Sequence, residues 1–343
     1  MSHFRFVLVA AAFLPFAGCG DGPAKTSKAV SLYCALDQEH SETLVQLFEK
    51  ETSIDVKTRF DTEASKTVGL VSSILDEAQR PRCDVFWNNE LAHTVRLGQK
   101  DMLEPYVSPA AAAIPDRYKD KDGEWTGFAA RARVLIVNTE LVAPEDYPKS
   151  VWDLIDPKWK GKCAIAKPVT GTTLTHFTTL ALKLGVEAFA RLTDGIKAND
   201  VVILASNGAT MKEVASGKLH WAFTDTDDFH VALQKGHKVA CVFPDQGENE
   251  LGTMLIPNSV ALIRGGPNPE AGKKLIDFIV SERVEAMLAS AKSAQIPLRS
   301  AVQGPPEKQI LKIGQFKEMP WDPAQTAQAL ATMSKRFESL FDR

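Results

Sequence analysis

The sequence lacks an excess of charge of either sign. It has 40 basic and 43 acidic residues among 343, and it contains no basic block. Proteins that bind nucleic acid, or that dock on anionic membranes by charge, carry clustered lysines and arginines. The composition therefore argues against a nucleic-acid partner and against electrostatic docking on a membrane.

Familiar catalytic and metal motifs are missing as well. The chain has no Gly-rich phosphate loop, no metalloprotease helix motif and no Gly-x-Ser-x-Gly elbow, and no internal repeat. Cysteine is scarce, with 5 in the chain, and no pair has the spacing of a zinc site. Cys34, Cys83, Cys163 and Cys241 each lie in or beside an apolar run, so both buried thiols and a disulfide remain open.

The N-terminus has the order of a secretory signal. Arg5 precedes the apolar stretch 6–16, which is too short to span a membrane as a mature helix, and Ala17 and Gly18 follow. Cys19 directly after Ala-Gly resembles a bacterial lipobox, in which the cysteine is acylated; cleavage without a lipid is the alternative. We predict a signal peptide over 1–18, a tether over 19–29, and a lipid that anchors the protein in the periplasm or at the cell surface.

The remaining 325 residues (343 minus 18) are long enough for two lobes, and strands alternate with helices along them. The first series has strands at 29–33, 54–60 and 83–87, with helices at 41–51 and 65–79. The second has strands at 134–137, 163–166, 201–204, 219–223 and 239–243, with helices at 172–184, 188–198 and 207–216. Strands at 252–256 and 259–263 return to the first sheet, and helices at 269–281, 282–289 and 320–341 complete the chain.

Such alternation builds parallel sheets with helices on both faces, so the predicted fold class is α/β. The predicted first lobe comprises 30–133 and 258–305, the second lobe 134–257, and a C-terminal helical segment 306–343. Two crossings, near 133–136 and 255–258, connect the lobes and predict a hinge. A solute that touches both lobes would favour the closed state by its differential affinity.

An acidic run, Thr224-Asp225-Thr226-Asp227-Asp228, follows the apolar stretch 219–223. Its carboxylates are expected at the C-terminal end of a buried strand. Three carboxylates within four residues repel one another, and a cation, an amine or nearby positive dipoles would offset that repulsion. The alternative is a solvated acidic turn, because Asp and Thr are ordinary turn residues.

Other polar residues also follow predicted strands. Thr170, Gly171 and Thr172 lie between a strand and a helix, where N–H groups and the helix dipole favour an anion, although N-capping alone also explains them. Asp37 follows the first strand, and Asn89 and Glu90 follow the third. Arg131 and Arg133 alternate with alanine near the first crossing, so one is expected to reach an anion in the cleft while the other meets solvent. His40 and His230 are possible metal ligands, but such histidines are more often surface residues.

Six short sequence segments, in this order, resemble segments of a known protein family. They are Leu32-Tyr33, Phe48 to Thr52, Asp84 to Trp87, Arg131 to Val134, Pro157 to Lys162 and Gln295 to Leu298. From about residue 30 to 302 the chain resembles the substrate-binding proteins of bacterial ABC importers, in particular the periplasmic ferric-iron-binding proteins. The resemblance implies a type II periplasmic binding protein fold, with two α/β lobes joined by a two-strand hinge. It also implies a permease and an ATPase as partners.

The resemblance further implies where a ligand lies. In the iron proteins a His after the first strand, a Glu after the third and two adjacent Tyr hold the metal, beside an anion at a helix start. The corresponding residues here are Asp37, Asn89, Asp227 and Asp228, so none of the four residue types is kept. The anion segment corresponds to Thr170, Gly171 and Thr172. Asn207 and Asp225 also fall on cleft-facing positions of the family.

Different ligands fit this replacement, because carboxylates are hard oxygen ligands for many cations and also counter-charges for an amine. One is a hard metal ion on Asp37, Asp227 and Asp228 with an anion on 170–172; the others are a zwitterion such as an aminophosphonate, or a phosphorylated sugar. We predict a monomeric receptor with no resident cofactor, a bound metal being the transported ligand, and no catalysis. The rival is a hydrolase that uses Asp227 and Asp228 as an acid/base pair, which the lack of a nucleophile motif weakens.

Overall fold

The computed structural model describes residues 1, 29–36, 38–61, 67–305 and 310–341. Apart from Met1, the predicted signal peptide lies outside these residues, and so do Asp37, the side chain of His40 and almost all of the tether, including Cys19. Among the helices that are described, none is both long enough and apolar enough to cross a membrane.

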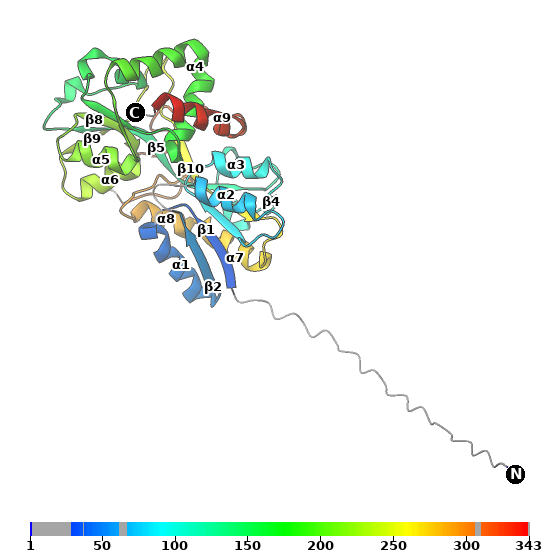
Figure 1. The fold of residues 1–343 in the computed structure, drawn as a ribbon. Coiled ribbons are helices and arrows are strands. Elements are labelled where there is room, and N and C mark those ends of the chain that lie inside the picture. Colours follow the sequence, from blue (N-terminus) through cyan, green and yellow to red (C-terminus); the bar gives the residue numbers. More distant parts are fainter. Residues whose placement is uncertain (2–28, 37, 62–66, 306–309, 342–343) are drawn as a thin grey trace.

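A mixed sheet runs through the whole molecule, in the strand order β2-β1-β3-β10-β5-β8-β6-β7, with β4 beside β10 and β9 beside β5. Helices cover it in two lobes, one above the other in Figure 1. The first lobe contains β1 (Ala29–Cys34), β2 (Asp55–Phe60), β3 (Val85–Asn88), β4 (Leu103–Glu104) and β10 (Leu255–Ile263). The second contains β6 (Cys163–Ala166), β7 (Val202–Leu204), β8 (Trp221–Asp225) and β9 (Val239–Val242). Strand β5 (Thr126–Asn138) belongs to both.

Strands β5 and β10 connect the two lobes. The first half of β5 pairs with β10, and from Arg133 onward β5 pairs with β8 and then β9. The end of the predicted strand 252–256 and the whole of 259–263 belong to one strand, β10, whose register shifts between Pro257 and Asn258. Proline cannot donate a ladder hydrogen bond, and an irregularity lets the strand continue past it. The two-lobed fold with a two-strand hinge is thereby confirmed.

Amphipathic helices cover both faces of the sheet. The helices of the first lobe are α1 (Gln38–Thr52), α2 (Val68–Asp76), α3 (Ala92–Gly98), α7 (Pro269–Ile279) and α8 (Glu282–Ser290). Those of the second are α4 (Gly171–Ala198), α5 (Asn207–Ala215) and α6 (Thr226–Gln234). Short 3-10 helices occur at Pro109–Ala111, Asp116–Tyr118, Pro144–Asp146, Val151–Ile155 and Pro157–Trp159. In α1, for example, Leu44 and Phe48 are buried one turn apart, which is the helical spacing that predicted this element.

The break predicted between 184 and 188 occurs inside α4. Gly185 has φ of 74° and ψ of 175°, so the helical conformation is interrupted there. Glycine adopts this conformation at little steric cost. The two predicted helices are therefore two segments of α4 on either side of Gly185.

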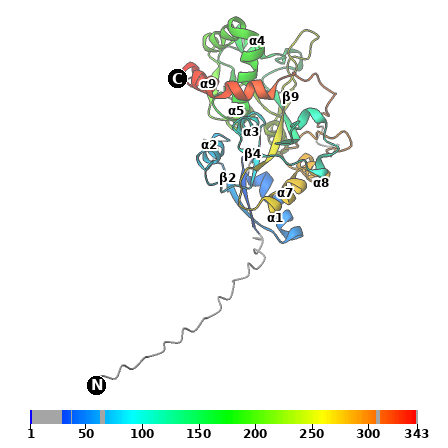
Figure 2. The ribbon, with the colours of Figure 1, turned by 90° about the vertical axis from the view of Figure 1, so that its right-hand side faces the viewer.

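The last helix, α9 (Pro323–Phe341), contacts both lobes, as Figure 2 shows. Gln99 of the first lobe donates a hydrogen bond to the Ala324 carbonyl at 3.0 Å. The Thr326 hydroxyl lies 3.3 Å from that of Thr179 in α4. The apolar side of α9 packs in the core of the second lobe.

Cys34, Cys83, Cys163 and Cys241, the four cysteines among the described residues, form no disulfide with one another. Cys34, Cys83 and Cys163 are buried and Cys241 is half-buried. Of the two alternatives that the sequence leaves open, these residues take the role of small apolar side chains.

Candidate functional site

A cavity of about 130 Å³ lies where α4, α5 and α6 begin, and Asn89 faces it from the first lobe. Each of the three helices follows a strand of the second lobe: α4 follows β6, α5 follows β7 and α6 follows β8. The first N–H groups of a helix have no partner within the helix, and the dipole makes this end positive. Helix starts that converge on one cavity favour an anion there.

Gly171, the first residue of α4, has φ of +57°, and a Cβ there would meet nothing within 4 Å. Glycine is therefore needed for the backbone conformation and not for space. Thr170 occupies the N-cap position, and its side chain makes no bond to the N–H groups of α4. The side chain of Thr170 therefore does not cap α4, so side-chain capping does not explain this residue.

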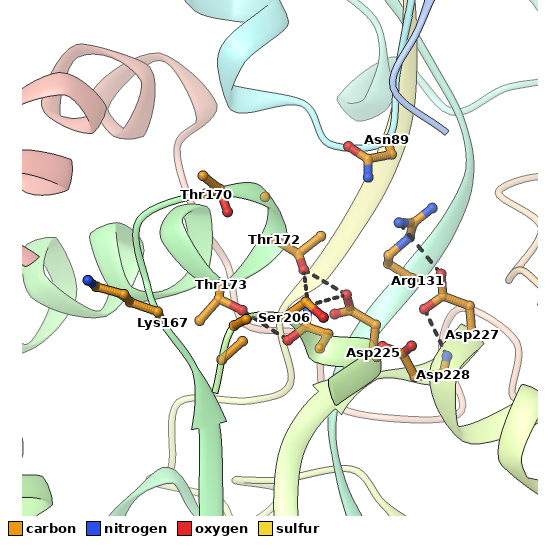
Figure 3. Close-up of a pocket in the computed structure, with 15 residues that line it drawn as sticks. Asn89, Arg131, Lys167, Thr170, Thr172, Thr173, Ser206, Asp225, Asp227 and Asp228 are labelled. Atoms are coloured by element: carbon orange, nitrogen blue, oxygen red, sulfur yellow. Dashed lines mark hydrogen bonds and ion pairs between the residues drawn. The ribbon is translucent and has the colours of Figure 1, made fainter. Parts of the chain in front are cut away.

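Asp225 organises the side chains at the base of the cavity. It lies at the N-cap position of α6 but makes no side-chain bond to the N–H groups of that helix. Instead its Oδ1 accepts from Arg133 Nη1 at 2.7 Å, and its Oδ2 accepts from Thr172 Oγ1 at 2.6 Å and Asn207 Nδ2 at 3.0 Å. The carboxylate thus ties β5, α4 and α5 to the end of β8. Figure 3 shows its bond to Thr172.

The Asn207 amide extends this network. Its Nδ2 also donates to Thr172 Oγ1 at 2.9 Å, and its Oδ1 accepts from Thr173 Oγ1 at 3.0 Å. The side chains of Thr172 and Asn207, which the sequence places in the site, are therefore oriented by Asp225. The backbone N–H groups at the helix starts are the donors best placed for an anion.

Asp227 and Asp228 lie in the first turn of α6, a helix that the sequence analysis did not predict. Asp227 Oδ2 is 3.6 Å from Arg131 Nη1, and Asp227 Oδ1 accepts the Asp228 N–H at 3.2 Å. Asp228 Oδ2 accepts from Thr224 Oγ1 at 2.7 Å. The acidic run therefore continues into a helix and does not form a turn, and the side chains of Asp227 and Asp228 are half-buried.

One carboxylate oxygen from each of Asp225, Asp227 and Asp228 lies within 4.8 Å of the others, a spacing that a metal ion can span. Arg131 supplies positive charge next to them, because its Nη1 lies 3.6 Å from Asp227 Oδ2, and its Nη2 donates to Asn258 Oδ1 at 3.1 Å beside the hinge. Lys167 also lines the cavity, but on the side away from the aspartates, as Figure 3 shows. The cavity therefore has an acidic end with an adjacent arginine and an anion-favouring end.

The expectation that either Arg131 or Arg133 meets solvent is wrong. Arg131 is 4% exposed and Arg133 is 0% exposed. Residues two apart on a strand project from the same face, so both side chains leave β5 on the side of the helix starts. Every residue of β5 is buried, because helices and neighbouring strands cover it throughout.

Asn89 and Glu90 have different surroundings although they are neighbours. Asn89 lines the cavity, and its Oδ1 accepts from Thr67 Oγ1 at 2.8 Å. Glu90 is fully buried outside the cavity lining, where it accepts the Ala92 and His93 N–H groups at 2.7 and 2.8 Å. Its Oε2 also accepts from Thr175 of α4 at 2.9 Å. The structure thus has Glu90 capping α3 and joining the lobes, and it does not place this predicted ligand-binding residue in the lining of the cavity.

His230 is buried and lines a different cavity, with Phe229 and Leu233, so it does not join the acidic end. Ser206 and Gly208, which were not among the predicted site residues, line the cavity at the start of α5. The signal that would have found them is their position directly after a predicted strand, where Ser206 is the N-cap of α5.

Two histidines are buried next to the site. Burial, with a smaller contribution from the Arg133 guanidinium, lowers the pKa of His176 well below its usual value. Burial also lowers the pKa of His93. Both rings are therefore neutral in the folded protein at neutral pH, and His176 packs against Phe223 with ring centroids 5.4 Å apart.

These histidines predict a loss of stability in acid. Below about pH 6.5 the unfolded chain takes up protons that the folded chain does not. The free energy of unfolding therefore decreases as the pH is lowered, by up to about 1.4 kcal/mol per pH unit for each histidine. Urea denaturation at several values between pH 7 and 5 measures the slope. His176→Gln should make it shallower, and His237→Gln, at an exposed position, should leave it unchanged. An unchanged slope in His176→Gln would contradict the assignment.

Comparisons with known proteins agree with this architecture. The sequence profile of the bacterial extracellular solute-binding proteins matches residues 93–326. Iron uptake protein A1 of Synechocystis sp. is 26% identical over 313 residues, covering 88% of this chain and 84% of that protein. A putative 2-aminoethylphosphonate-binding periplasmic protein of Salmonella typhi is 27% identical over 238 residues, covering 68% of this chain and 67% of that one.

The crystal structure of iron-bound HitA from Pseudomonas aeruginosa has the same fold, with a TM-score of 0.81 at 23% identity, covering 90% of this chain and 99% of HitA. This likeness supports the type II periplasmic binding protein fold described above. The family profile extends over more than half of the chain, from α3 into α9. The chain therefore belongs to the bacterial extracellular solute-binding proteins.

Proposed function

We propose that this protein is the substrate-binding component of a bacterial ABC importer, which captures a small solute between its lobes and delivers it to a permease coupled to an ATPase. Family membership, the hinge of β5 and β10, and the cavity at three helix starts support this role. In the same proposal the protein is a monomer in the periplasm or at the cell surface, anchored through an acylated Cys19. It has no resident cofactor and catalyses no reaction.

The observation that carries the proposal is the two-ended charge of the cavity. The starts of α4 and α5 form an end that favours an anion, and Asp227 and Asp228 form an acidic end within the same 130 Å³. A solute that satisfies both ends carries a negative and a positive group. We propose first a hard metal ion held with an anion, because carboxylate oxygens suit such ions and a relative is named an iron uptake protein.

A zwitterion such as an aminophosphonate is the second candidate, and the position of Arg131 favours it. The guanidinium lies 3.6 Å from Asp227 and already supplies positive charge at the acidic end. Repulsion from it disfavours a bare multivalent cation more than a singly charged ammonium group. The relative from Salmonella typhi that is named a putative 2-aminoethylphosphonate-binding periplasmic protein supports this candidate. A phosphorylated small molecule would use the same anion end.

The test is to purify the protein natively and to analyse one sample for metals and for organic ligands by mass spectrometry. A metal near one equivalent would support the first candidate, and a phosphorus-containing zwitterion the second. If the protein bound neither kind of ligand in calorimetric titrations, the receptor proposal would fail. Turnover of phosphate esters or glycosides above that of an Asp228→Ala control would also contradict it and favour the hydrolase.

A further inference from the structure

We propose that Arg133 is a specificity-determining and positioning residue of this site: by pairing with Asp225 it keeps that carboxylate out of the acidic end and leaves the helix starts open to an anion. The inference rests on the proposed two-ended cavity. It assigns different functions to neighbouring acids. Asp225 holds the framework of the site together, and Asp227 and Asp228 contact the ligand.

The contacts of Arg133 are one-sided. Nη1 donates to Asp225 Oδ1 at 2.7 Å and to Thr172 Oγ1 at 3.3 Å. Nε and Nη2 are buried and have no hydrogen-bond partner among the described residues. Burying a guanidinium with unsatisfied nitrogens is unfavourable, and a close carboxylate offsets part of that cost. The stability of the buried Arg133 charge therefore depends mainly on Asp225. An arginine with all its nitrogens hydrogen-bonded would depend less on a single carboxylate.

Two other groups of the described residues that lie close to Arg133, the Phe223 ring and the His176 ring, carry no negative charge. The Arg133 Cζ lies 5.9 Å from the centroid of the Phe223 ring. His176 on α4 interacts with the same guanidinium and has a pKa well below its usual value, so it is neutral at pH 7. The side chain of Arg133 is 0% exposed and that of Asp225 is 5% exposed, so solvent screens the pair little.

The direction of the Asp225 side chain follows from this pair. An aspartate at an N-cap position ordinarily accepts N–H groups of its own helix, but Asp225 makes no such bond. Its carboxylate turns instead to Arg133, Thr172 and Asn207. Without the guanidinium, its charge would repel an anion at the starts of α4 and α5. It would also add to Asp227 and Asp228, which lie within 4.8 Å, and create a stronger cation site.

The experiment uses the full chain and two probes, inorganic phosphate by calorimetry and Mn²⁺ alone by electron paramagnetic resonance. Arg133→Met should weaken phosphate binding and tighten Mn²⁺ binding, each by at least about tenfold, because one buried negative charge is exposed to both ligands. Arg133→Lys keeps the positive charge and should stay within about threefold of wild type for both probes. Arg133→Met/Asp225→Asn removes both charges and should return both affinities toward wild type, which the loss of packing alone would not explain.

Circular dichroism establishes that each variant is folded. If Arg133→Met does not fold, Asp225→Asn decides: it leaves Arg133 uncompensated, and phosphate should bind at least about threefold tighter with no gain for Mn²⁺. Wild-type affinities for both probes in a folded Arg133→Met protein would overturn the inference, and so would a double variant that matches Arg133→Met. A wild type without affinity for phosphate would count against the anion end of the proposed function, while the Mn²⁺ comparison would still decide the role of Arg133.

Discussion

Asp228→Asn should weaken binding of the natively co-purified ligand by about 2 to 5 kcal/mol, the range for a buried charge that loses its partner. Asp228 is half-buried at the start of α6, and Thr224 Oγ1 fixes its carboxylate at 2.7 Å. An asparagine oxygen can still accept that hydrogen bond, so the side chain should keep its place and lose only its charge. Asp225 cannot substitute for it, because Arg133 already pairs with Asp225 at 2.7 Å.

The same substitution should change stability only slightly. Loss of a carboxylate from the first turn of a helix costs about 0.3 to 1 kcal/mol, and relief of repulsion from Asp225 and Asp227 opposes this loss. Calorimetric titration gives the affinity, and thermal unfolding of the empty protein gives the stability. Glu282→Gln is the matched control, since it removes an exposed acid from the first turn of α8. Equal affinities of wild type and Asp228→Asn would mean that the acidic end does not contact the ligand.

Much of the fold could be predicted from local sequence, because each buried strand of this α/β protein is a short apolar run. Cys163–Ala166 forms a strand with the predicted bounds, and the helix predicted over 207–216 ends one residue earlier, at Ala215. Strand β5 was predicted too short because Phe128 to Arg133 mixes alanine with arginine, a pattern that does not read as a core strand. Only the tertiary structure shows that β5 is central in both lobes and that its arginines are buried with acids.

The candidate site was predicted in outline, because residues after parallel strands meet at one edge of the sheet. Thr170, Asn207 and the acidic run do meet there. What the sequence could not supply is the partner of each side chain. Glu90 follows a strand just as Asn89 does, yet it turns away to cap α3 and to bond Thr175. Asp225, Asp227 and Asp228 are similar in sequence, and their partners in the structure distinguish them: Arg133 for Asp225, Arg131 for Asp227 and Thr224 for Asp228.

The segment Gln295 to Leu298 packs against the hinge strands, and buried polar side chains connect it to them. Ile296 and Ala130 exchange backbone hydrogen bonds of 2.7 Å, and Asn258 Nδ2 donates to Gln295 Oε1 at 2.7 Å. Glu285 of α8 accepts the N–H groups of Leu298 at 2.7 Å and Ala129 at 3.2 Å. Ala129 has φ of 32°, which is unusual for a residue other than glycine. Glu285 therefore holds β5 in an uncommon conformation next to the crossing.

Arg299→Met should destabilise the protein by about 3 to 5 kcal/mol, because it leaves the buried Glu285 carboxylate without its counter-charge. Arg299 Nη1 lies 2.9 Å from Glu285 Oε2, and the two side chains are 2% and 0% exposed. Arg299 Nη2 also donates to the carbonyls of Ala110 and Val280 at 2.6 Å each, so two acceptors lose a donor as well. The change in the free energy of unfolding can be measured by urea denaturation at pH 7.

Arg283→Met on the same helix as Glu285 is the matched control. Arg283 pairs with Glu51 at 2.7 Å, but these side chains are 56% and 40% exposed. An exposed pair contributes at most about 1 kcal/mol, so this variant should be close to wild type. Glu285→Gln combined with Arg299→Met should recover part of the loss, because the acid that lacks a partner is then neutral. A cost for Arg299→Met no larger than that for Arg283→Met would contradict the stabilising role assigned to the Glu285 and Arg299 pair.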